Sequence, residues 1–196
     1  ELGVYENTLI IFTSDNGPTY NGGTDSPWFD SGGPFKSEYG FGKGFVNEGG
    51  IRVPLIVSWP GTIKPGSTSD HVSAFWDWLP TLCEISGIKP PDDIDGISFL
   101  PELKGQKQQQ HQYLYWEFPE YGGQQAVLLG KWKAIRKNMQ KGNKIWELYN
   151  LELDPVESTD VAANHPSVIK EVEEIVKKEH IKSGNRNFWL KILDVD

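Results

Sequence analysis

Two short apolar runs near the start of the chain have the pattern of buried β-strands. Residues 7–13 (NTLIIFT) and residues 53–59 (VPLIVSW) are nearly unbroken apolar stretches rich in β-branched residues. Such runs are typical of strands that are covered on both faces in an α/β sheet. A dense turn signal, Ser-Asp-Asn-Gly-Pro, ends the first run at residues 14–18, and Pro60-Gly61 closes the second. We therefore expect an α/β region here.

A short helix and a long loop complete the first half of the chain. Residues 77–86 predict a helix, with Asp77 as its N-cap, Pro80 in its first turn and Gly87 as its stop. Residues 19–44, by contrast, are rich in Gly, Ser, Pro and aromatic residues and have no helix or strand pattern. A loop of this length is usually either functional or disordered. Its aromatic content favours a functional loop.

The pattern changes after a polar tract that ends near residue 112. Four short apolar runs follow at close spacing, over residues 113–118, 126–129, 132–136 and 145–149. Their spacing predicts an antiparallel meander. Residues 164–181 then place valine and isoleucine on one helical face with Lys and Glu opposite, which predicts a long amphipathic helix. We expect the α/β region to cover residues 1–105 and a C-terminal α+β subdomain to cover residues 106–196.

The net acidic charge of the chain lies entirely in its first half. The 196 residues include 19 Lys and Arg and 27 Asp and Glu, a net charge of −8. Residues 1–100 alone carry 5 basic and 13 acidic residues, which also gives −8. No basic stripe is available for a phosphate backbone, which argues against nucleic acid as a partner and leaves a divalent cation as a better match. No run approaches the roughly 18 apolar residues that span a bilayer.

The strongest candidate site directly follows the first predicted strand. Asp15 and Asn16 come where the carboxyl end of that strand would face the ligand crevice of an open α/β sheet. A carboxylate beside a carboxamide offers two hard oxygen ligands, which suits Ca²⁺ or Mg²⁺. The alternative is an ordinary turn in which these side chains cap their own backbone. The four residues Ser-Asp-Asn-Gly by themselves favour that simpler alternative.

A second candidate is the lysine of Gly42-Lys43-Gly44, which precedes the sequence EGGIRVP at residues 48–54. A lysine between two glycines has an exposed backbone that a ligand can approach closely, and its ammonium can be placed on an anionic group. A solvated lysine in a mobile loop is the simpler explanation of this motif when it is considered alone.

Taken together, in this order and spacing, the motifs resemble the type I sulfatases, the arylsulfatase family of the alkaline phosphatase superfamily. The resemblance extends to five further motifs, which are DWLPTL at 77–82, DGISFLP at 95–101, GKWK at 130–133, ELYNL at 147–151 and DPVE at 154–157. It implies the fold of that family. We expect part of an alkaline-phosphatase-like, mostly parallel sheet, plus a smaller C-terminal antiparallel sheet with a packed helix.

The resemblance also implies roles for individual residues. Asp15 and Asn16 match the pair that ligates the active-site Ca²⁺, or Mg²⁺ in some members. Lys43 matches the lysine that contacts the sulfate oxygens and stabilises charge as the ester bond breaks. Glu48 and Arg52 match the EGG-x-R motif, and we expect them to brace the loop first and to contact substrate second.

The nucleophile of the family has no counterpart in this chain. In the family it is a formylglycine made from the Cys or Ser of a Cys/Ser-x-Pro/Ala-x-Arg motif, which lies N-terminal to the Asp-Asn-Gly strand together with an Asp-Asp metal pair. Thr19 also stands where many relatives have a histidine. We therefore expect this chain to be the C-terminal portion of a sulfatase, with its nucleophile upstream, and to be inactive alone.

The single cysteine and the four histidines complete the inventory of reactive side chains. Cys83 lies inside the helix predicted over residues 77–86 and lacks the neighbouring Pro and Arg of the nucleophile motif, so we expect a buried structural residue. The histidines form no pair with metal-binding spacing, and we expect surface or capping roles for all four, His71, His111, His165 and His180.

We expect the full-length form to be a sulfuric ester hydrolase that acts on a sulfated carbohydrate or an aryl sulfate with Ca²⁺ and formylglycine. Sugar faces can stack on the aromatic residues Trp28, Phe29, Trp116, Tyr121 and Trp132. Two alternatives stay open, a phosphoesterase or phosphonate hydrolase of the same superfamily and a non-catalytic binding module. The resemblance implies a periplasmic, extracellular or lysosomal location. Apolar surface on the two strands can lead to self-association.

Overall fold

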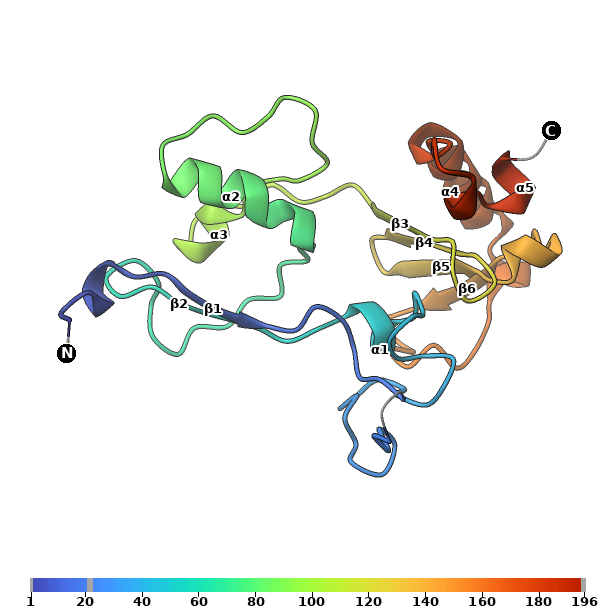
Figure 1. Cartoon of the computed structure of the whole chain (residues 1–196), viewed down its shortest axis with the longest axis horizontal. Helices are drawn as coiled ribbons and strands as arrows, with labels where there is room; N and C mark the ends of the chain where they lie inside the picture. The colour runs from blue at the N-terminus through green and yellow to red at the C-terminus, as the bar shows by residue number, and fades with distance from the viewer. Residues whose placement is uncertain (1, 21–22, 195–196) are drawn as a thin grey trace. The chain divides into compact units, whose positions relative to one another are not determined.

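The computed structural model describes residues 2–20 and 23–194, which form two compact units (Figure 1). One unit contains the chain up to Thr13 together with Leu55–Gln112, and the other contains Ser14–Pro54 together with the chain from Tyr113 onward. The long loop between the two predicted strands thus groups with the C-terminal sheet rather than with those strands. The domain boundary expected between residues 105 and 106 stays a prediction.

In the first unit, the two predicted strands are confirmed as β1 (Ile10–Thr13) and β2 (Leu55–Ser58). They pair with each other in the antiparallel sense, with Ile10 opposite Ser58 and Thr13 opposite Leu55. These two strands therefore do not form the parallel pairing expected of a mostly parallel sheet. Phe12 and Ile56 are exposed, since this sheet has only these two strands among the residues that the structure describes.

The predicted short helix of the first unit is confirmed as α2 (Trp78–Ile85), which begins directly after Asp77 and follows a single 3₁₀ turn at Phe75–Asp77. Asp77 stands at its N-cap, but its carboxylate does not bond the backbone of this helix. It instead accepts hydrogen bonds from the backbone N–H groups of Ala74, at 2.7 Å, and of Ile97, at 2.8 Å. The expected capping role is therefore wrong, and the buried Asp77 fastens the connector at residues 95–99.

The same connector is held at a second point. Thr81 accepts a hydrogen bond from the backbone N–H of Phe99 at 3.0 Å. A Cβ at Gly96 would lie 2.2 Å from the Trp76 carbonyl oxygen, so only glycine allows this approach. The motifs at residues 77–82 and 95–101 thus pack against each other. The second motif leads into α3 (Leu100–Leu103).

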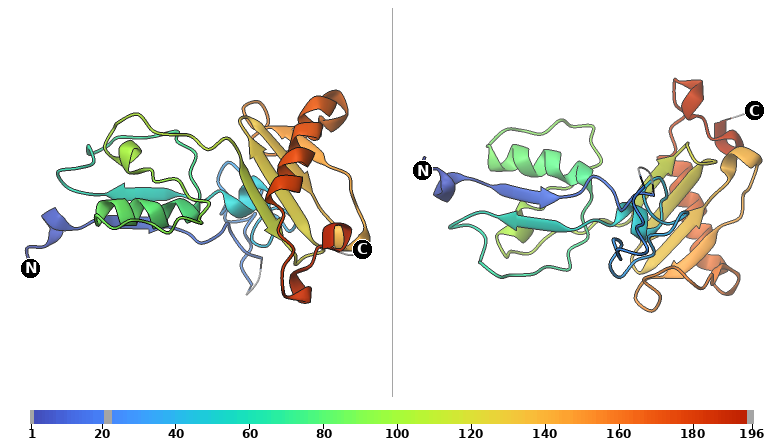
Figure 2. Two further views of the ribbon diagram at one scale, coloured as in Figure 1. Left: turned by 90° about the horizontal axis from the view of Figure 1, so that it is seen from above. Right: turned by 60° about the horizontal axis from the view of Figure 1, so that its bottom comes forward.

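The second unit contains the predicted antiparallel meander. Its strands are β3 (Leu114–Phe118), β4 (Gln124–Leu129), β5 (Trp132–Arg136) and β6 (Glu147–Asn150), and they pair in the order β3-β4-β5-β6. Every neighbouring pair is antiparallel, as the close spacing of the runs predicted. The long helix is confirmed as α4 (Pro166–Glu179). It lies across one face of the sheet (Figure 2).

Consecutive residues of the strands contribute to opposite faces of this sheet, as the period of two requires. One face packs on α4, and its core consists of Val127, Ala134, Trp146, Leu148, Val172, Ile175 and Val176. On the other face, Ala126, Ile135 and Tyr149 pack against Val46 of the long loop. A helix and a loop thus cover the two faces of the sheet, and the loop covers the second through Val46.

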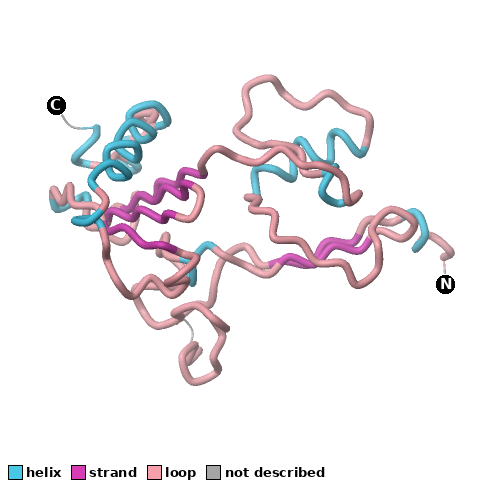
Figure 3. Tube along the Cα trace, turned by 180° about the vertical axis from the view of Figure 1, so that it is seen from behind, coloured by secondary structure: helices cyan, strands magenta, loops and turns pink. Residues whose placement is uncertain are grey.

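The remaining elements are short. The second unit also contains α1 (Glu48–Ile51) and α5 (Lys191–Asp194), and further 3₁₀ turns lie at Tyr5–Asn7, Met139–Lys141, Ala162–Asn164 and Arg186–Phe188. From residue 14 to α1 the described chain has neither helix nor strand (Figure 3). No helix of the described residues combines the length and the apolar character that a membrane crossing requires.

The two faces of the sheet predict where a truncated leucine is costly. Leu148 is fully buried in the face that packs on α4, whereas Leu153 is 83% exposed in the following turn. We expect Leu148→Ala to lower the free energy of unfolding by about 2–5 kcal/mol, because it leaves a cavity. The matched change Leu153→Ala is expected to alter it by less than about 0.5 kcal/mol. Urea unfolding followed by circular dichroism measures both, and equal effects would contradict this packing.

Candidate functional site

The three predicted site residues lie on the loop of the second unit that follows β1. Asp15 and Asn16 come two and three residues after Thr13, the last residue of the strand. The backbone N–H of Lys43 donates to the Pro18 carbonyl at 2.8 Å, and the N–H of Gly17 donates to the Gly50 carbonyl at 2.9 Å. These two bonds connect the Asp-Asn-Gly-Pro turn to both glycine-containing motifs, which are separated from it by more than twenty residues of sequence.

Glycine is required where these segments meet. A Cβ at Gly17 would lie 1.8 Å from the Gly49 carbonyl oxygen, and one at Gly42 would lie 2.4 Å from that of Pro18. Neither distance is sterically possible for a side chain, and the contacting atoms belong to the backbone, which cannot easily move away. The glycines of the three motifs thus serve close backbone packing around the candidate site.

The side chains of the candidate site are accessible to a ligand. Asp15 and Lys43 are exposed, and Asn16 is half-buried. The Asn16 amide nitrogen donates to the Gly17 carbonyl at 2.9 Å, which leaves its amide oxygen available as a ligand. The local bond expected of an ordinary turn is therefore present, and it is compatible with a ligating role.

The residues fit part of a hard-cation shell. The Asp15 carboxylate and the Asn16 amide oxygen are the ligand type that Ca²⁺ and Mg²⁺ prefer, but Ca²⁺ takes about six to eight oxygens. Among the described residues, no group of three or more His, Cys, Asp or Glu side chains could hold a metal ion. Asp15 and Asn16 would thus contribute ligands to a site that other groups complete.

A buried ion pair connects this loop to the C-terminal sheet. Glu48, in α1, accepts a hydrogen bond from the Lys133 ammonium at 2.7 Å and one from the Arg52 guanidinium at 3.3 Å. Lys133 lies on β5 and is fully buried. Burial alone would raise the pKa of Glu48, but Lys133 and then Arg52 hold it below its ordinary value. This is the bracing role expected of Glu48 and Arg52.

A second buried carboxyl fixes the start of the same short helix. Glu157 accepts hydrogen bonds from the Asn47 side-chain amide at 2.8 Å and from the backbone N–H of Glu48 at 3.0 Å. Burial raises the pKa of Glu157. The other oxygen of this carboxyl and the Asn47 amide oxygen are both buried without a hydrogen-bond partner. The motif at residues 154–157 therefore acts on the loop that carries the candidate site.

The supporting role of Lys133 and Glu157 could not be assigned from the chain pattern. Both residues appear in motifs that the sequence singles out, GKWK and DPVE. Their partners, however, lie 85 and 110 residues away in sequence, at Glu48 and Asn47. The available signal in the sequence was the position of Lys133 in a predicted strand, between the apolar residues Trp132 and Ala134.

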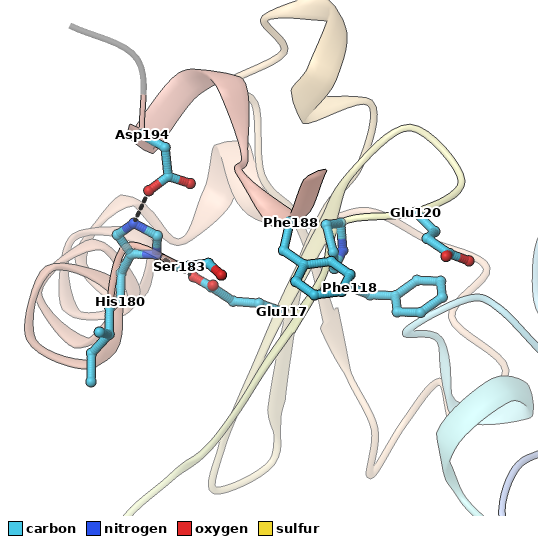
Figure 4. A pocket seen from close by; sticks show the side chains of 9 residues that line it. Glu117, Phe118, Glu120, His180, Ser183, Phe188 and Asp194 are labelled. Carbon is cyan, nitrogen blue, oxygen red and sulfur yellow. Dashed lines mark hydrogen bonds and ion pairs between the residues drawn. The ribbon is translucent and has the colours of Figure 1, made fainter. Parts of the chain in front are cut away.

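The expectations for two histidines and for the cysteine need correction. His111 is nearly buried and contacts the Asp77 carboxylate at 2.9 Å. His180 contacts Glu117 at 2.7 Å through Nδ1 and Asp194 at 3.0 Å through Nε2 (Figure 4). Their partners lie 14 to 63 residues away, so local sequence did not reveal them. Cys83 is only half-buried.

His180 also borders a pocket of about 280 Å³ in the second unit. Its other walls include Glu117, Phe118, Glu120, Phe188 and Asp194 (Figure 4). None of the three predicted site residues lines this pocket.

Comparison with known proteins finds one matching family. The family described as N-sulphoglucosamine sulphohydrolase, C-terminal, matches residues 37–183. An N-acetylgalactosamine-6-O-sulfatase of Bacteroides thetaiotaomicron is 29% identical over 191 residues, which cover 90% of this chain and 37% of that protein. Human arylsulfatase A is 38% identical over 138 residues, which cover 68% of this chain and 26% of that protein.

Solved structures give the same picture. The structure of a protein in complex with its substrate D-glucosamine-2-N,6-O-disulfate matches with a TM-score of 0.69 and 27% identity, over 90% of this chain and 34% of that one. The chain thus spans between a quarter and two fifths of the length of these three proteins.

The buried ion pair predicts a large difference between two neighbouring lysines. Lys133→Met leaves Glu48 buried without its closest cation, and we expect a loss of about 3–5 kcal/mol in unfolding free energy. Lys131→Met changes an exposed lysine two residues away on the same hairpin, and less than about 0.5 kcal/mol is expected. Denaturant unfolding of both variants makes the comparison. Similar small losses would show that the pair does not support the fold.

The raised pKa of Glu157 predicts a pH-dependent effect. Because its folded pKa lies above the ordinary 4.5, its contribution to stability is fully present below that pH and is lost as the pH rises through the folded pKa. Glu157→Gln keeps an acceptor for Asn47 and Glu48 but cannot ionise. We expect its stability relative to the parent chain to improve as the pH rises above about 4.5 and Glu157 of the parent chain ionises. Exposed Glu152→Gln is the control, and parallel stability curves for all three proteins would contradict the assignment.

Proposed function

Because this chain belongs to the sulfatase family, in the region that the N-sulphoglucosamine sulphohydrolase C-terminal family covers, we propose that it carries metal-binding and sulfate-binding residues of a sulfuric ester hydrolase. Membership confirms the predicted family and its fold class. The observation that carries the proposal is the joining of the Asp15-Asn16 turn to the Lys43 loop by the bond from Lys43 N–H to the Pro18 carbonyl.

In this proposal Asp15, Asn16 and Lys43 have separate roles on a sulfate ester. Asp15 and Asn16 contribute two oxygens to a Ca²⁺ or Mg²⁺ site. The cation, when bound, would polarise the sulfate as a Lewis acid. Lys43 places its ammonium on the sulfate oxygens and stabilises the charge that develops as the ester bond breaks. The formylglycine nucleophile is supplied from outside this chain.

The buried groups keep that arrangement in place. Glu48 and Glu157 hold α1, and Gly50 at the end of the EGG sequence accepts the hydrogen bond from Gly17. The exposed lysine and aspartate therefore sit on a loop whose backbone is anchored in the sheet. Electrostatic stabilisation needs such preorganisation, because a charged group that must reorient during the reaction contributes less.

We propose sulfated carbohydrate as the substrate class. Two of the similar proteins are named for, or bound to, sulfated amino sugars. Of the aromatic residues expected to stack on sugar, Trp116 and Trp132 are half-buried and pack around the two faces of the sheet. Those two rings therefore serve the fold, whereas Tyr121 is exposed.

The test compares variants in the complete protein with 4-nitrocatechol sulfate as substrate and added Ca²⁺. We expect Asp15→Ala to abolish turnover and Lys43→Ala to lower kcat by about 10²- to 10³-fold, because each removes charge stabilisation at the reacting sulfate. Lys144→Ala, at another exposed lysine, is expected to retain the parent rate. Full activity of Asp15→Ala would contradict the site. Faster hydrolysis of a matched phosphonate ester would favour the phosphonate hydrolase, and absence of any turnover would favour the binding module.

A further inference from the structure

Five aromatic rings form a continuous row beside the Gly42–Gly44 loop. This aromatic strip consists of Tyr20, Tyr39, Phe45, Tyr121 and Phe118, in that order. The distances between successive ring centroids are 6.3, 5.4, 5.4 and 6.0 Å. All five belong to the second unit. Tyr20, Tyr39 and Phe45 come from the loop between β1 and β2, Phe118 is the last residue of β3, and Tyr121 lies in the turn between β3 and β4.

The strip is anchored at its base but open at its surface. Phe118 packs against the core that contains Val46 and Ile135. The three tyrosines, in contrast, keep much of their surface exposed, with values of 42% for Tyr20, 69% for Tyr39 and 46% for Tyr121. Burial in the core therefore does not account for their arrangement.

The backbone is shaped to hold Tyr121 in this row. Tyr121 has a φ of +49°, which is sterically unfavourable for a bulky side chain. Its ring lies so close to Gly44 that a Cβ there would be 2.9 Å from the ring carbon Cε2. Strained residues of this kind concentrate at functional sites, because the surrounding structure must hold them in place. The contact also places the strip directly beside Lys43, the residue before Gly44.

Exposed tyrosines are suited to a ligand that is apolar on its ring face and polar at its rim. Tyrosine offers a large, rigid contact surface at low cost in side-chain entropy, together with a hydroxyl that can hydrogen-bond. A sugar ring has this character, with C–H groups on its face and hydroxyls around its edge. An aromatic surface beside a few polar groups is also the common composition of a ligand site.

The charges on either side of the strip indicate how a substrate would lie. Lys43 is exposed and can take a sulfate. Beyond the other side, Phe118 also lines the pocket of Figure 4, together with the carboxylates of Glu117, Glu120 and Asp194. Carboxylates accept hydrogen bonds from hydroxyls and repel a sulfate. The sulfated residue therefore belongs at Lys43, and an uncharged residue belongs on the strip.

We propose that Tyr20, Tyr39 and Tyr121 bind an uncharged sugar ring adjoining the sulfated one, so that the substrate is a sulfated oligosaccharide rather than a small aryl sulfate. The proposal rests on the proposed function, because the sulfate is assigned to Lys43. The three tyrosines are specificity residues in this assignment and take no part in breaking the ester bond.

Binding to the chain itself provides the first test in isothermal calorimetry. The probe is a keratan sulfate hexasaccharide that is sulfated only on N-acetylglucosamine, so that an uncharged galactose adjoins each sulfated ring. We expect Tyr39→Ala to weaken binding about tenfold, because an aromatic contact is lost. Tyr39→Phe keeps the ring and is expected to stay within about threefold of the parent chain. Tyr5→Ala, a matched tyrosine that is 56% exposed in the first unit, should change nothing. Equal losses for Tyr39→Ala and Tyr5→Ala, or no loss for Tyr39→Ala, would overturn the proposal.

Kinetics of the complete protein separate this proposal from the proposed function. With the hexasaccharide, Tyr39→Ala is expected to raise KM about tenfold and to leave kcat unchanged. An unchanged KM in a protein that still hydrolyses 4-nitrocatechol sulfate would overturn the strip and leave the proposed function standing. Tyrosine-dependent binding of the hexasaccharide without any sulfate hydrolysis would support the strip and overturn the proposed function. If Tyr39→Ala only abolishes self-association in sedimentation, the strip is a contact between copies and the sugar site is wrong.

Discussion

The ion pair between Glu48 and Lys133 is the interaction on which the arrangement of this protein depends. It joins the helix α1, near the end of the segment between β1 and β2, to the strand β5 across 85 residues of sequence. Removing two charges from water is costly unless each is well paired. Here Glu48 also has Arg52, and the Lys133 ammonium lies 5.4 Å from the centre of the Trp116 ring. The pair therefore specifies where the loop must dock.

The docked loop explains why the candidate site belongs with the C-terminal sheet. Ser14–Pro54 groups with the chain from Tyr113 onward, although the two strands that flank this loop lie in the other unit. One face of the sheet is covered by Val46 of the loop, and Glu157 holds the first turn of α1. The C-terminal sheet thus supports the residues that follow the end of β1, and it contributes to the proposed chemistry by positioning them.

Buried and exposed groups have separate tasks in this arrangement. Glu48, Lys133 and Glu157 are buried, and they position the loop without being accessible to a substrate, through the Glu48–Lys133 pair and the bonds that Glu157 accepts from Asn47 and the Glu48 backbone. Asp15, Lys43 and the three tyrosines of the aromatic strip are exposed. A substrate that covers them would gain charge and aromatic contacts together. The Tyr121 ring, held by a strained backbone, packs directly on Gly44, which has no side chain. This contact places the aromatic contacts beside the charge of Lys43.

Local patterns in the sequence were sufficient to predict most of the secondary structure. The apolar runs identified β1 to β6 and the amphipathic period identified α4, because these signals depend only on neighbouring residues. For Asp15, Asn16 and Lys43 the local residues alone favoured an ordinary turn and a solvated lysine, and only the resemblance to the type I sulfatases implied metal and sulfate chemistry. Tertiary structure alone decided that β1 and β2 pair antiparallel, that Asp77 binds a connector and His111, and that Lys133 and Glu157 brace the loop. Each of these depends on partners distant in sequence, and a local pattern carries no information about which distant partner a buried polar group will meet.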